Sequence, residues 1–297
     1  MSPALAILGV TASGKSALAM TLSERYPDVE LVSVDSMQVY RGMDIGTAKP
    51  TADERLRVRH HLIDLFEPDH EVTVVEFAAA YDDALAEIAA RGHRAVLVGG
   101  TALYLRAVLD RLQPPGQWPQ VRVELEADPD LAGRYAQLQR LDPVAAAKID
   151  PGNRRRIVRA LGVCLGSGRP FSSFGAGLDT YPPTDTPVVA LRWSRPDIAT
   201  RITQRIDTQL EAGWLGEARD LQARELSRTA CQALGYGELF AHLRGELTMA
   251  AAREAIITRT RQFAVRQEKW FRRDPRIQWL DPHDDPLGSV QAYLEPT

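Results

Sequence analysis

The stretch LAILGVTASGKS, from Leu5 to Ser16, decides the fold of this chain. Its first four residues are apolar, as in a buried strand, and the residues from Gly9 onward fit the pattern G-x-x-x-x-G-K-[ST]. Residues 17–26 then follow the pattern of a helix. A strand, a glycine-rich loop and a helix in this order can surround a di- or triphosphate with backbone N–H groups. The stretch therefore predicts a phosphate loop on an α/β sheet.

The side chains of this loop add to what its backbone can bind. Lys15 contributes a positive charge, and the Ser16 hydroxyl can bind Mg²⁺, which generally accompanies a polyphosphate. A glycine-rich turn capped by Ser13 is the structural alternative. The predicted phosphate-binding residues are Gly9, Thr11, Ala12, Ser13, Gly14, Lys15 and Ser16, and Ser16 is also the predicted metal ligand.

Composition is that of a globular protein of enzyme size. The chain has 297 residues, of which 44% are hydrophobic, and its net charge of −3 argues against indiscriminate binding of polyanions. The first residues carry no basic segment and their apolar run ends at Gly9, so we expect neither a secretion signal nor a membrane span. A cytoplasmic location is the default expectation. Cys164 and Cys231 lack partners at ligand spacing, so we expect neither a disulfide framework nor a zinc site.

Apolar runs alternate with helical patterns along much of the chain. Residues 74–91 place apolar side chains at helical spacing, and Gly92 ends the pattern. This alternation predicts a P-loop NTPase-like fold, an α/β architecture with a parallel sheet flanked by helices. The predicted strands are residues 5–8, 30–34, 95–98, 188–191 and 276–280.

One internal region departs from this alternation. Between residues 111 and 187 strand signals fade, proline and glycine cluster, and the intervening residues predict two or three helices. We interpret residues 113–185 as a helical insertion domain in a catalytic core made of residues 1–112 and 186–297.

Polar side chains follow two other predicted strands. Asp35 comes directly after the strand 30–34, and Thr101 comes shortly after the strand 95–98. Ligands of parallel sheets bind at the carboxyl ends of the strands, so both side chains are candidates for the site. Asp35 is the obvious proton acceptor, although a turn or N-cap role is favoured for it in isolation. Thr101 can likewise serve as the N-cap of the helix that follows it.

Several longer segments resemble one family, the tRNA dimethylallyltransferases, also called tRNA isopentenyltransferases. They occur in the family's order over nearly the whole chain: GVTASGKS, VDSMQVYRGMDIGTAKP, HHLIDLFEP, VGGTALYLRAVLD, LDPVAAAKIDPGNRRRIVRAL, TACQALGYGEL and RQEKWFRRD. The chain departs from the family pattern at Val10, Gly162 and Ser167, where proline, glutamate and threonine are common. None of these departures removes a group on which the implied chemistry depends.

The resemblance implies transfer of a dimethylallyl group from dimethylallyl diphosphate to the N6 amine of the adenosine immediately 3′ of a tRNA anticodon. The phosphate loop would then hold a diphosphate leaving group, with Mg²⁺ as cofactor, and the tRNA partner would bind through its anticodon stem-loop. A monomer acting on one tRNA is the simplest expectation.

The resemblance also implies roles for single residues. Asp35 accepts a proton from the attacking amine, Thr101 lies at the departing diphosphate oxygen, and Arg122 approaches the adenosine or the leaving group; these three are the predicted catalytic residues. On spacing alone Arg122 is a solvated surface arginine. Arg205 is the predicted diphosphate-binding arginine, with Arg201 as the alternative.

Binding of tRNA requires local positive charge, and two clusters supply it. The first lies at residues 154–159, and the second, at residues 253–276, has an excess of five positive charges. Such runs are usually solvated helix faces, but they also suit phosphate contact. Of Trp270 and Phe271, we expect at least one in the core. The predicted tRNA-binding residues are Asp35, Ser36, Met37, Gln38, Arg155, Arg156, Arg159, Arg266, Gln267 and Arg272.

The same residues also allow three alternative interpretations. A small-molecule kinase would bind ATP in the same loop and transfer a phosphoryl group, but the segments DSMQVY and GGTALY do not resemble that arrangement. A noncatalytic RNA-binding protein explains the arginine clusters but not the joint presence of Lys15, Ser16, Asp35 and Thr101. A metal site in HHLID, residues 60–64, is less favoured than a structural or substrate-positioning role because a third convincing ligand is lacking.

Overall fold

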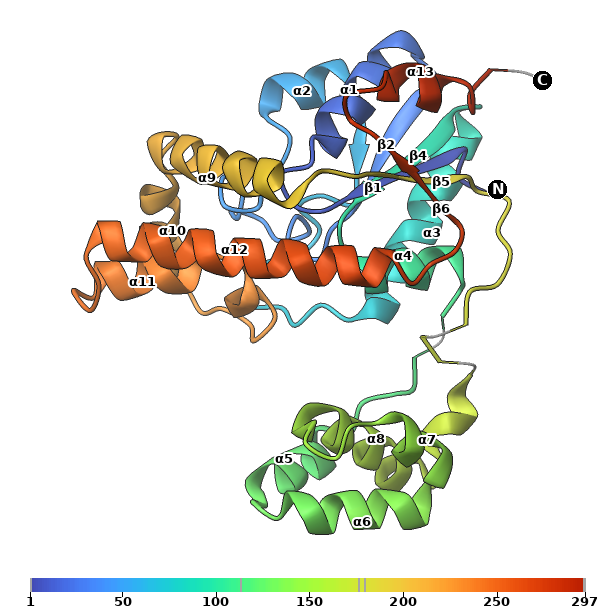
Figure 1. The fold of residues 1–297 in the computed structure, drawn as a ribbon, viewed down its shortest axis with the longest axis vertical. Helices are drawn as coiled ribbons and strands as arrows, with labels where there is room; N and C mark the ends of the chain where they lie inside the picture. Colours follow the sequence, from blue (N-terminus) through green and yellow to red (C-terminus); the bar gives the residue numbers. More distant parts are fainter. Residues whose placement is uncertain (1, 113, 176, 179, 296–297) are drawn as a thin grey trace. The chain divides into compact units, whose positions relative to one another are not determined.

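The computed structural model describes residues 2–112, 114–175, 177–178 and 180–295. The chain forms two compact units (Figure 1): a core unit, Met1–Arg111 with Pro182–Thr297, and an insertion unit, Leu112–Tyr181. The insertion was expected at residues 113–185, and residue 113 lies outside the described residues. Each unit has its own apolar core.

The core unit is built on one parallel sheet with the strand order β3-β2-β4-β1-β5-β6. The strands are β1 (Leu5–Gly9), β2 (Val29–Val34), β3 (His60–His61), β4 (Arg94–Gly99), β5 (Val188–Leu191) and β6 (Ile277–Leu280). Gly99 of β4 pairs with Leu8 of β1 and Val34 of β2, so these three strands end at nearly the same level. The predicted parallel α/β sheet is confirmed. β3 was not predicted because two residues are too short for a periodic signal.

Helices cover both faces of this sheet (Figure 1). Ala6 and Leu8 of β1 belong to the apolar core shared with α3, α4, α9, α10, α11 and α12. Leu5 and Ile7 belong to the core shared with α1 and α13 on the opposite face. The helices of this unit are α1 (Lys15–Arg25), α2 (Ala52–Arg57), α3 (Val74–Ala90), α4 (Ala102–Leu109), α9 (Arg195–Glu211), α10 (Trp214–Gln222), α11 (Tyr236–Leu243), α12 (Met249–Phe271) and α13 (Pro286–Gln291).

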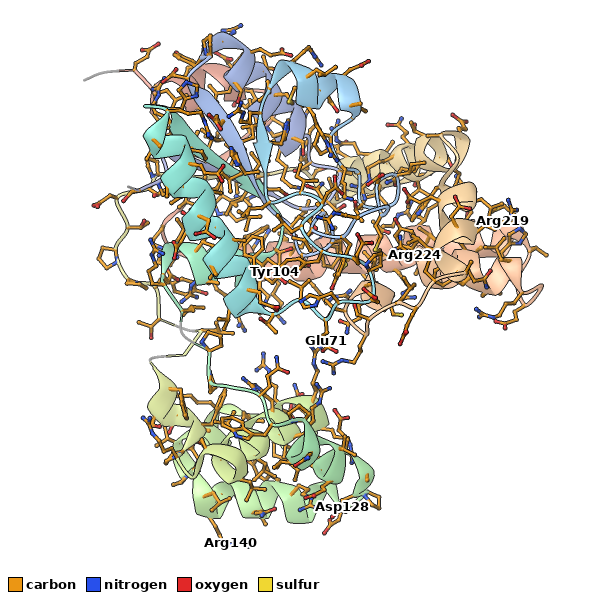
Figure 2. All side chains as sticks on the ribbon, turned by 180° about the vertical axis from the view of Figure 1, so that it is seen from behind. Glu71, Tyr104, Asp128, Arg140, Arg219 and Arg224 are labelled. Atoms are coloured by element: carbon orange, nitrogen blue, oxygen red, sulfur yellow. The ribbon has the colours of Figure 1, made fainter. Side chains whose placement is uncertain are left out.

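Local sequence explains the predicted helix α3. The Thr73 hydroxyl accepts a hydrogen bond from the Glu76 N–H, and the Glu76 carboxylate accepts one from the Thr73 N–H, which forms a capping box. Beyond this cap, Phe77 packs against Tyr104 of α4 with ring centroids 4.2 Å apart, and Figure 2 labels Tyr104 within the core unit. The helix ends at Ala90, one residue earlier than predicted.

The insertion unit is helical, as expected, but has more helices than predicted. Its described part contains α5 (Pro119–Ala127), α6 (Leu131–Leu141), α7 (Pro143–Lys148), α8 (Arg154–Ser167) and a short 3₁₀ helix (Phe171–Phe174). Asp142 explains the extra boundary, because it ends α6 and its carboxylate accepts the Ala145 N–H that begins α7. Across the described residues of both units, no helix is long and apolar enough to span a bilayer.

Candidate active site

The phosphate loop runs from Gly9, at the end of β1, to Lys15, at the start of α1. Ala12 and Gly14 both have left-handed backbone, with φ angles of 61° and 90°. A side chain at Gly9 would crowd the loop, because a Cβ atom there would lie 2.3 Å from the Ser13 hydroxyl oxygen and one of the two would have to move. The loop therefore turns tightly into the amino terminus of α1, which is a favourable position for an anion.

Two side chains from the segment after β5 hold the loop backbone. Trp193 donates its indole N–H to the carbonyl of Ser13 at 2.8 Å, and Arg201 donates its Nε–H to the carbonyl of Ala12 at 2.8 Å. The Arg201 guanidinium also stacks over the Trp193 ring, 4.2 Å from its centroid. Arg201 is thus occupied in bracing the loop, a role that the sequence analysis did not identify for either residue.

Lys15 and Arg205 bring positive charge with few internal partners. Burial lowers the pKa of Lys15 to about 8; nearby Asp35 acts against this shift and nearby Arg205 adds to it. Burial also lowers the pKa of Arg205, again opposed by Asp35. The Lys15 amine is 3.4 Å from the Val10 carbonyl, and the buried Arg205 Nε has no hydrogen-bond partner within the described residues. These two cations can be neutralised by an anionic ligand, and between Arg201 and Arg205 this favours Arg205 as the ligand contact.

Asp35 and Thr101 lie at the adjacent strand ends. The Asp35 Oδ1 accepts a hydrogen bond from the Met37 N–H at 2.8 Å, so the turn role considered for it does occur. Its Oδ2 makes no hydrogen bond to any residue that the structure describes. Thr101 occupies the N-cap position of α4 but makes no side-chain cap. Its hydroxyl instead accepts the Ser36 N–H at 3.2 Å and donates to the Ser36 hydroxyl at 3.4 Å.

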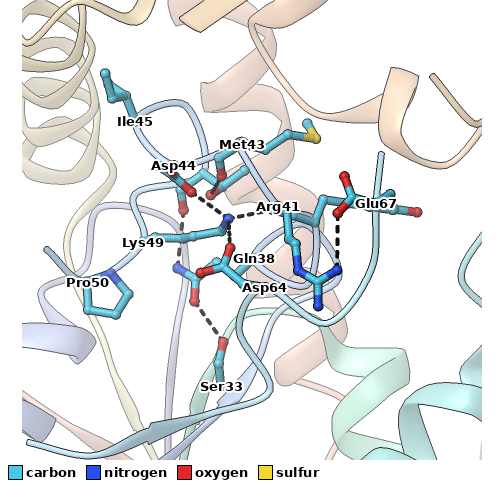
Figure 3. A network of polar contacts seen from close by, with 12 residues as sticks. Ser33, Gln38, Arg41, Met43, Asp44, Ile45, Lys49, Pro50, Asp64 and Glu67 are labelled. Carbon is cyan, nitrogen blue, oxygen red and sulfur yellow. Dashed lines mark hydrogen bonds and ion pairs between the residues drawn. The ribbon is translucent and has the colours of Figure 1, made fainter. Parts of the chain in front are cut away.

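Gln38 lies in the same turn, and its amide is used within the core unit (Figure 3). Its Oε1 accepts a hydrogen bond from the Ser33 hydroxyl at 2.7 Å, and its Nε2 donates to the carbonyls of Thr47 and Ala48 at 3.2 and 3.1 Å. The amide connects the turn after β2 to the segment near residue 48, and the predicted contact of Gln38 with tRNA stays a prediction.

A buried lysine fixes the segment that follows Asp35 (Figure 3). The Lys49 amine contacts the carboxylates of Asp44 at 2.6 Å and Asp64 at 2.5 Å, and it donates to the Tyr40 carbonyl. Arg55 also binds Asp64, at 2.6 Å. Burial raises the pKa of Asp64, but hydrogen bonds from Lys49 and Arg55 outweigh this effect and hold its pKa below the usual range. These contacts leave the segment little freedom.

Glu217 of α10 binds the same segment, and the sequence analysis missed it. Its carboxylate accepts the backbone N–H groups of Asp44 and Ile45, both at 2.7 Å, and that of Gly46 at 3.0 Å. The Tyr236 hydroxyl donates to it at 2.6 Å. Helical spacing from the apolar residues Trp214 and Ala218, which are buried, was the signal that could have placed Glu217 beside the core-facing side of α10.

Gln267 has a different position from the one expected for a tRNA contact. It is 7% exposed, its Oε1 accepts the Thr11 N–H at 2.8 Å, and its Nε2 donates to the Gly100 carbonyl at 2.9 Å. It lies on the buried side of α12 with Ala264 and Phe271. Helical spacing from these two apolar residues was the signal that could have placed it inward. The N–H of Thr11, expected to bind phosphate, is occupied by Gln267.

The other predicted α12 residues are on the surface. Arg266 is exposed, with its guanidinium 5.8 Å from the Phe263 ring centroid. Arg272 is also exposed and binds Glu268 at 2.5 Å. Phe271 is buried, in agreement with the expected core position for one of the two aromatic residues.

Four predicted arginines belong to the insertion unit. Arg122 of α5 binds Glu126 at 2.8 Å, and Arg155 and Arg156 are exposed at the start of α8. Arg159 donates to two backbone carbonyls ahead of α5 at 2.7 and 2.9 Å. Its pKa is lowered by burial and further by Arg122. Within this unit, Arg155 and Arg156 are therefore the arginines of this set with the most accessible side chains.

The residues near the phosphate loop suit a magnesium ion that takes most of its coordinating oxygens from phosphate and water and few from the protein. Ser16 is exposed, and its hydroxyl makes no hydrogen bond to a described residue. The described residues contain no group of three His, Cys, Asp or Glu side chains that could hold a metal. A hydroxyl suits Mg²⁺, which commonly takes its other ligands from phosphate and water.

The histidines of HHLID, residues 60–64, make internal contacts. His61 contacts the buried Glu30 at 2.6 Å, and His60 contacts the Val58 carbonyl at 2.8 Å.

Comparison with known proteins agrees with this arrangement. Residues 38–274 match the family model described as IPP transferase. A tRNA dimethylallyltransferase from a Nocardioides species is 46% identical over 292 residues, which cover 96% of this chain and 93% of that protein. The crystal structure of the full-length tRNA isopentenylpyrophosphate transferase from Bacillus halodurans is 34% identical, with a TM-score of 0.69 and coverage of 98% of this chain and 94% of that one.

A further similar structure is a eukaryotic dimethylallyltransferase acting on tRNA. It is 27% identical, has a TM-score of 0.80, and is matched over 97% of this chain and 77% of its own. The relatives with 46% and 34% identity, together with the family model over residues 38–274, show the family of this chain. It is a member of the tRNA dimethylallyltransferase family.

Proposed function

We propose that this protein transfers a dimethylallyl group from dimethylallyl diphosphate to the N6 amine of the adenosine immediately 3′ of the anticodon in tRNA. The products are diphosphate and N6-isopentenyladenosine. The observation that carries the proposal is the convergence, in a chain of this family, of the phosphate loop, Asp35 and Thr101 at the carboxyl ends of β1, β2 and β4.

Asp35 is the proposed proton acceptor. The N6 amine is a poor nucleophile because its lone pair is delocalised into the purine, so removal of its proton during attack lowers the barrier. The Met37 N–H fixes one carboxylate oxygen of Asp35 at 2.8 Å, which leaves the other oxygen to accept the amine proton. The new bond joins the amine nitrogen to the allylic carbon, and the bond from that carbon to the diphosphate oxygen breaks.

The leaving diphosphate needs positive charge around it. Lys15 and Arg205 both lie close enough to Asp35 to interact with its charge, and the amino terminus of α1 adds the dipole of its N–H groups. Thr101 is proposed to donate its hydroxyl hydrogen to the departing oxygen. Ser16 would hold Mg²⁺, and the bound ion would neutralise charge on the diphosphate.

The tRNA anticodon stem-loop is proposed to contact exposed arginines in both units. Arg266 and Arg272 are exposed on α12, and Arg155 and Arg156 are exposed on α8. Guanidinium groups can bind RNA phosphates and stack on bases of a single-stranded loop. Because the proposed catalytic groups come from a single chain, we propose a monomer acting on one tRNA, in the cytoplasm.

Product identification tests this function. Purified protein is incubated with Mg²⁺, dimethylallyl diphosphate and unmodified tRNA, and the digested tRNA is examined for isopentenyladenosine by mass spectrometry. We expect the product only with the allylic donor. A parallel incubation replaces that donor with ATP. The proposal would fail if no isopentenyladenosine formed in several adenosine-rich anticodon loops and phosphorylation occurred in the ATP sample. A kinase activity would then replace it.

A further inference from the structure

We propose that Gln267 is a positioning residue that holds the phosphate loop at a fixed distance from the turn that carries Thr101. The inference rests on the proposed function for its catalytic consequence. The geometry itself rests only on contacts within the core unit.

One planar amide joins the two loops. The Gln267 Oε1 accepts the N–H of Thr11 at 2.8 Å, and its Nε2 donates to the carbonyl of Gly100 at 2.9 Å. The two bonds connect a residue in the last third of the chain to the ends of β1 and β4. Because the donor and the acceptor of a primary amide are fixed in one plane, their partners are held at a defined separation.

The surroundings of this amide favour a specific bridge over ordinary core packing. Gln267 is 7% exposed and lies between apolar positions on the buried side of α12, where an unpaired amide would be costly. A Cβ atom at position 100 would lie 2.5 Å from the Gln267 Nε2, so the glycine at this position makes room for the amide. Both polar ends are used, and both partners are main-chain atoms.

The separation of these loops matters for the proposed reaction. The phosphate loop would hold one end of the diphosphate, and Thr101, the residue after Gly100, would contact the oxygen that departs. A small change in the distance between these elements moves the leaving oxygen away from its hydrogen-bond donor, and misplacement of this kind can cost large factors in rate. Loss of the bridge should therefore weaken diphosphate binding and slow the chemical step, while leaving the tRNA surface intact.

Two substitutions separate the two bonds. Gln267→Met keeps the length and removes both hydrogen bonds. Gln267→Glu keeps an acceptor for the Thr11 N–H but places a second oxygen against the Gly100 carbonyl. The control is Gln222→Met, the same change at an exposed position at the end of α10.

The measurements are the dissociation constant for inorganic diphosphate, the KM for dimethylallyl diphosphate, kcat, the dissociation constant for tRNA, and the melting temperature. For Gln267→Met we expect diphosphate affinity and kcat each to fall about tenfold or more, with tRNA affinity within about twofold of wild type. Gln267→Glu should retain more diphosphate affinity than Gln267→Met but still lose kcat. Gln222→Met should match wild type.

The outcomes are distinguishable from failure of the proposed function. The inference would be overturned if both variants kept wild-type diphosphate affinity and kcat, even at a lower melting temperature. Gln267 would then have only a packing role. Equal losses of tRNA and diphosphate affinity would also overturn it. If the wild-type protein transfers no dimethylallyl group but its diphosphate affinity still depends on Gln267, the bridge stands and the proposed reaction fails.

Discussion

The hydroxyl of Thr101 accepts a hydrogen bond from the backbone N–H of Ser36 at 3.2 Å, which ties the end of β4 to the turn after β2. Asp35 belongs to that turn. The Thr101 N–H also donates to the Val34 carbonyl at 3.3 Å. The proposed proton acceptor and the proposed donor to the leaving group are therefore held together by hydrogen bonds between adjacent strand ends. The Thr101 hydroxyl donates to the Ser36 hydroxyl at 3.4 Å, which is long for an O–H···O hydrogen bond, so a diphosphate oxygen at a shorter distance would take this donor instead.

Removal of this hydroxyl should reduce catalysis. Thr101→Val preserves volume but leaves the Ser36 N–H unpaired, which should cost about 1 kcal/mol of stability, and it removes the donor to the leaving oxygen, which should lower kcat by about a hundredfold. Thr101→Ser keeps the hydroxyl and should retain most of the activity. Steady-state kinetics and chemical denaturation of both variants measure these effects. Equal activity of the Val and Ser variants would exclude a role for the hydroxyl.

Diphosphate binding should depend on pH through Lys15. Burial lowers the pKa of this amine to about 8, so in the unliganded protein its positive charge is present below pH 8 and lost as the pH rises through that value. The affinity for inorganic diphosphate should therefore weaken between pH 7 and pH 9.5 in the wild-type protein. The measurement is isothermal titration calorimetry across this range.

A matched variant corrects for titration of the ligand itself. Lys15→Met has no amine, so its weaker diphosphate binding should change with pH only as the ionisation of diphosphate requires. The ratio of wild-type to Lys15→Met affinity should fall on passing pH 8. A constant ratio would show that Lys15 does not contact diphosphate as a titrating cation.

The buried Lys49 should be important for stability and for the position of the turn at Asp35. Lys49→Met removes the partner of Asp44 and Asp64 and leaves the Tyr40 carbonyl without its donor. Because Arg55 still binds Asp64, we expect a loss of about 2–3 kcal/mol rather than complete unfolding. Chemical denaturation measures the change. Arg41→Met, which removes an exposed ion pair with Glu67, is the control and should cost under about 1 kcal/mol.

The exposed arginines of α12 should bind tRNA phosphates. Replacement of Arg266 and Arg272 by alanine should weaken tRNA binding about tenfold and reduce the slope of log affinity against log salt by about 1.5. Filter binding at several salt concentrations measures both quantities. The control is the double replacement of Arg25 and Arg57, which lie at the ends of α1 and α2. Equal effects of the two double variants would show only a loss of overall charge.

Local signals predicted much of the fold. The apolar run from Leu5, followed by the loop to Ser16, predicted β1, the phosphate loop and α1, because burial and glycine geometry act within a few residues there. The other four predicted strands had the same kind of apolar signal. β3 did not, since it consists of His60 and His61 only and depends on pairing with β2. Asp142 separates two helices with a single residue, which composition alone did not reveal.

The site was predicted less completely than the fold. Motif positions predict that Lys15 binds diphosphate and that Asp35 accepts a proton, since both lie shortly after strand ends, and these roles stay predictions. The position of Gln267 among arginines in the sequence predicts a tRNA contact, although its place on the helix turns it inward to residues more than 160 positions away. Arg201 and Arg205 are one helical turn apart, so sequence alone does not distinguish them. Their contacts do: Arg201 donates to the phosphate-loop backbone, whereas the Nε of Arg205 has no partner among the described residues.

The most direct test of the account compares the wild-type protein with Asp35→Asn in a single-turnover transfer assay, with the tRNA dissociation constant measured on the same preparations. Asparagine keeps an oxygen to accept the Met37 N–H, so the turn is preserved while the proton acceptor is removed. The account predicts that the transfer rate falls about a thousandfold with unchanged tRNA affinity. A transfer rate near wild type, or equal losses of rate and tRNA affinity, would contradict the assignment of Asp35 as the proton acceptor.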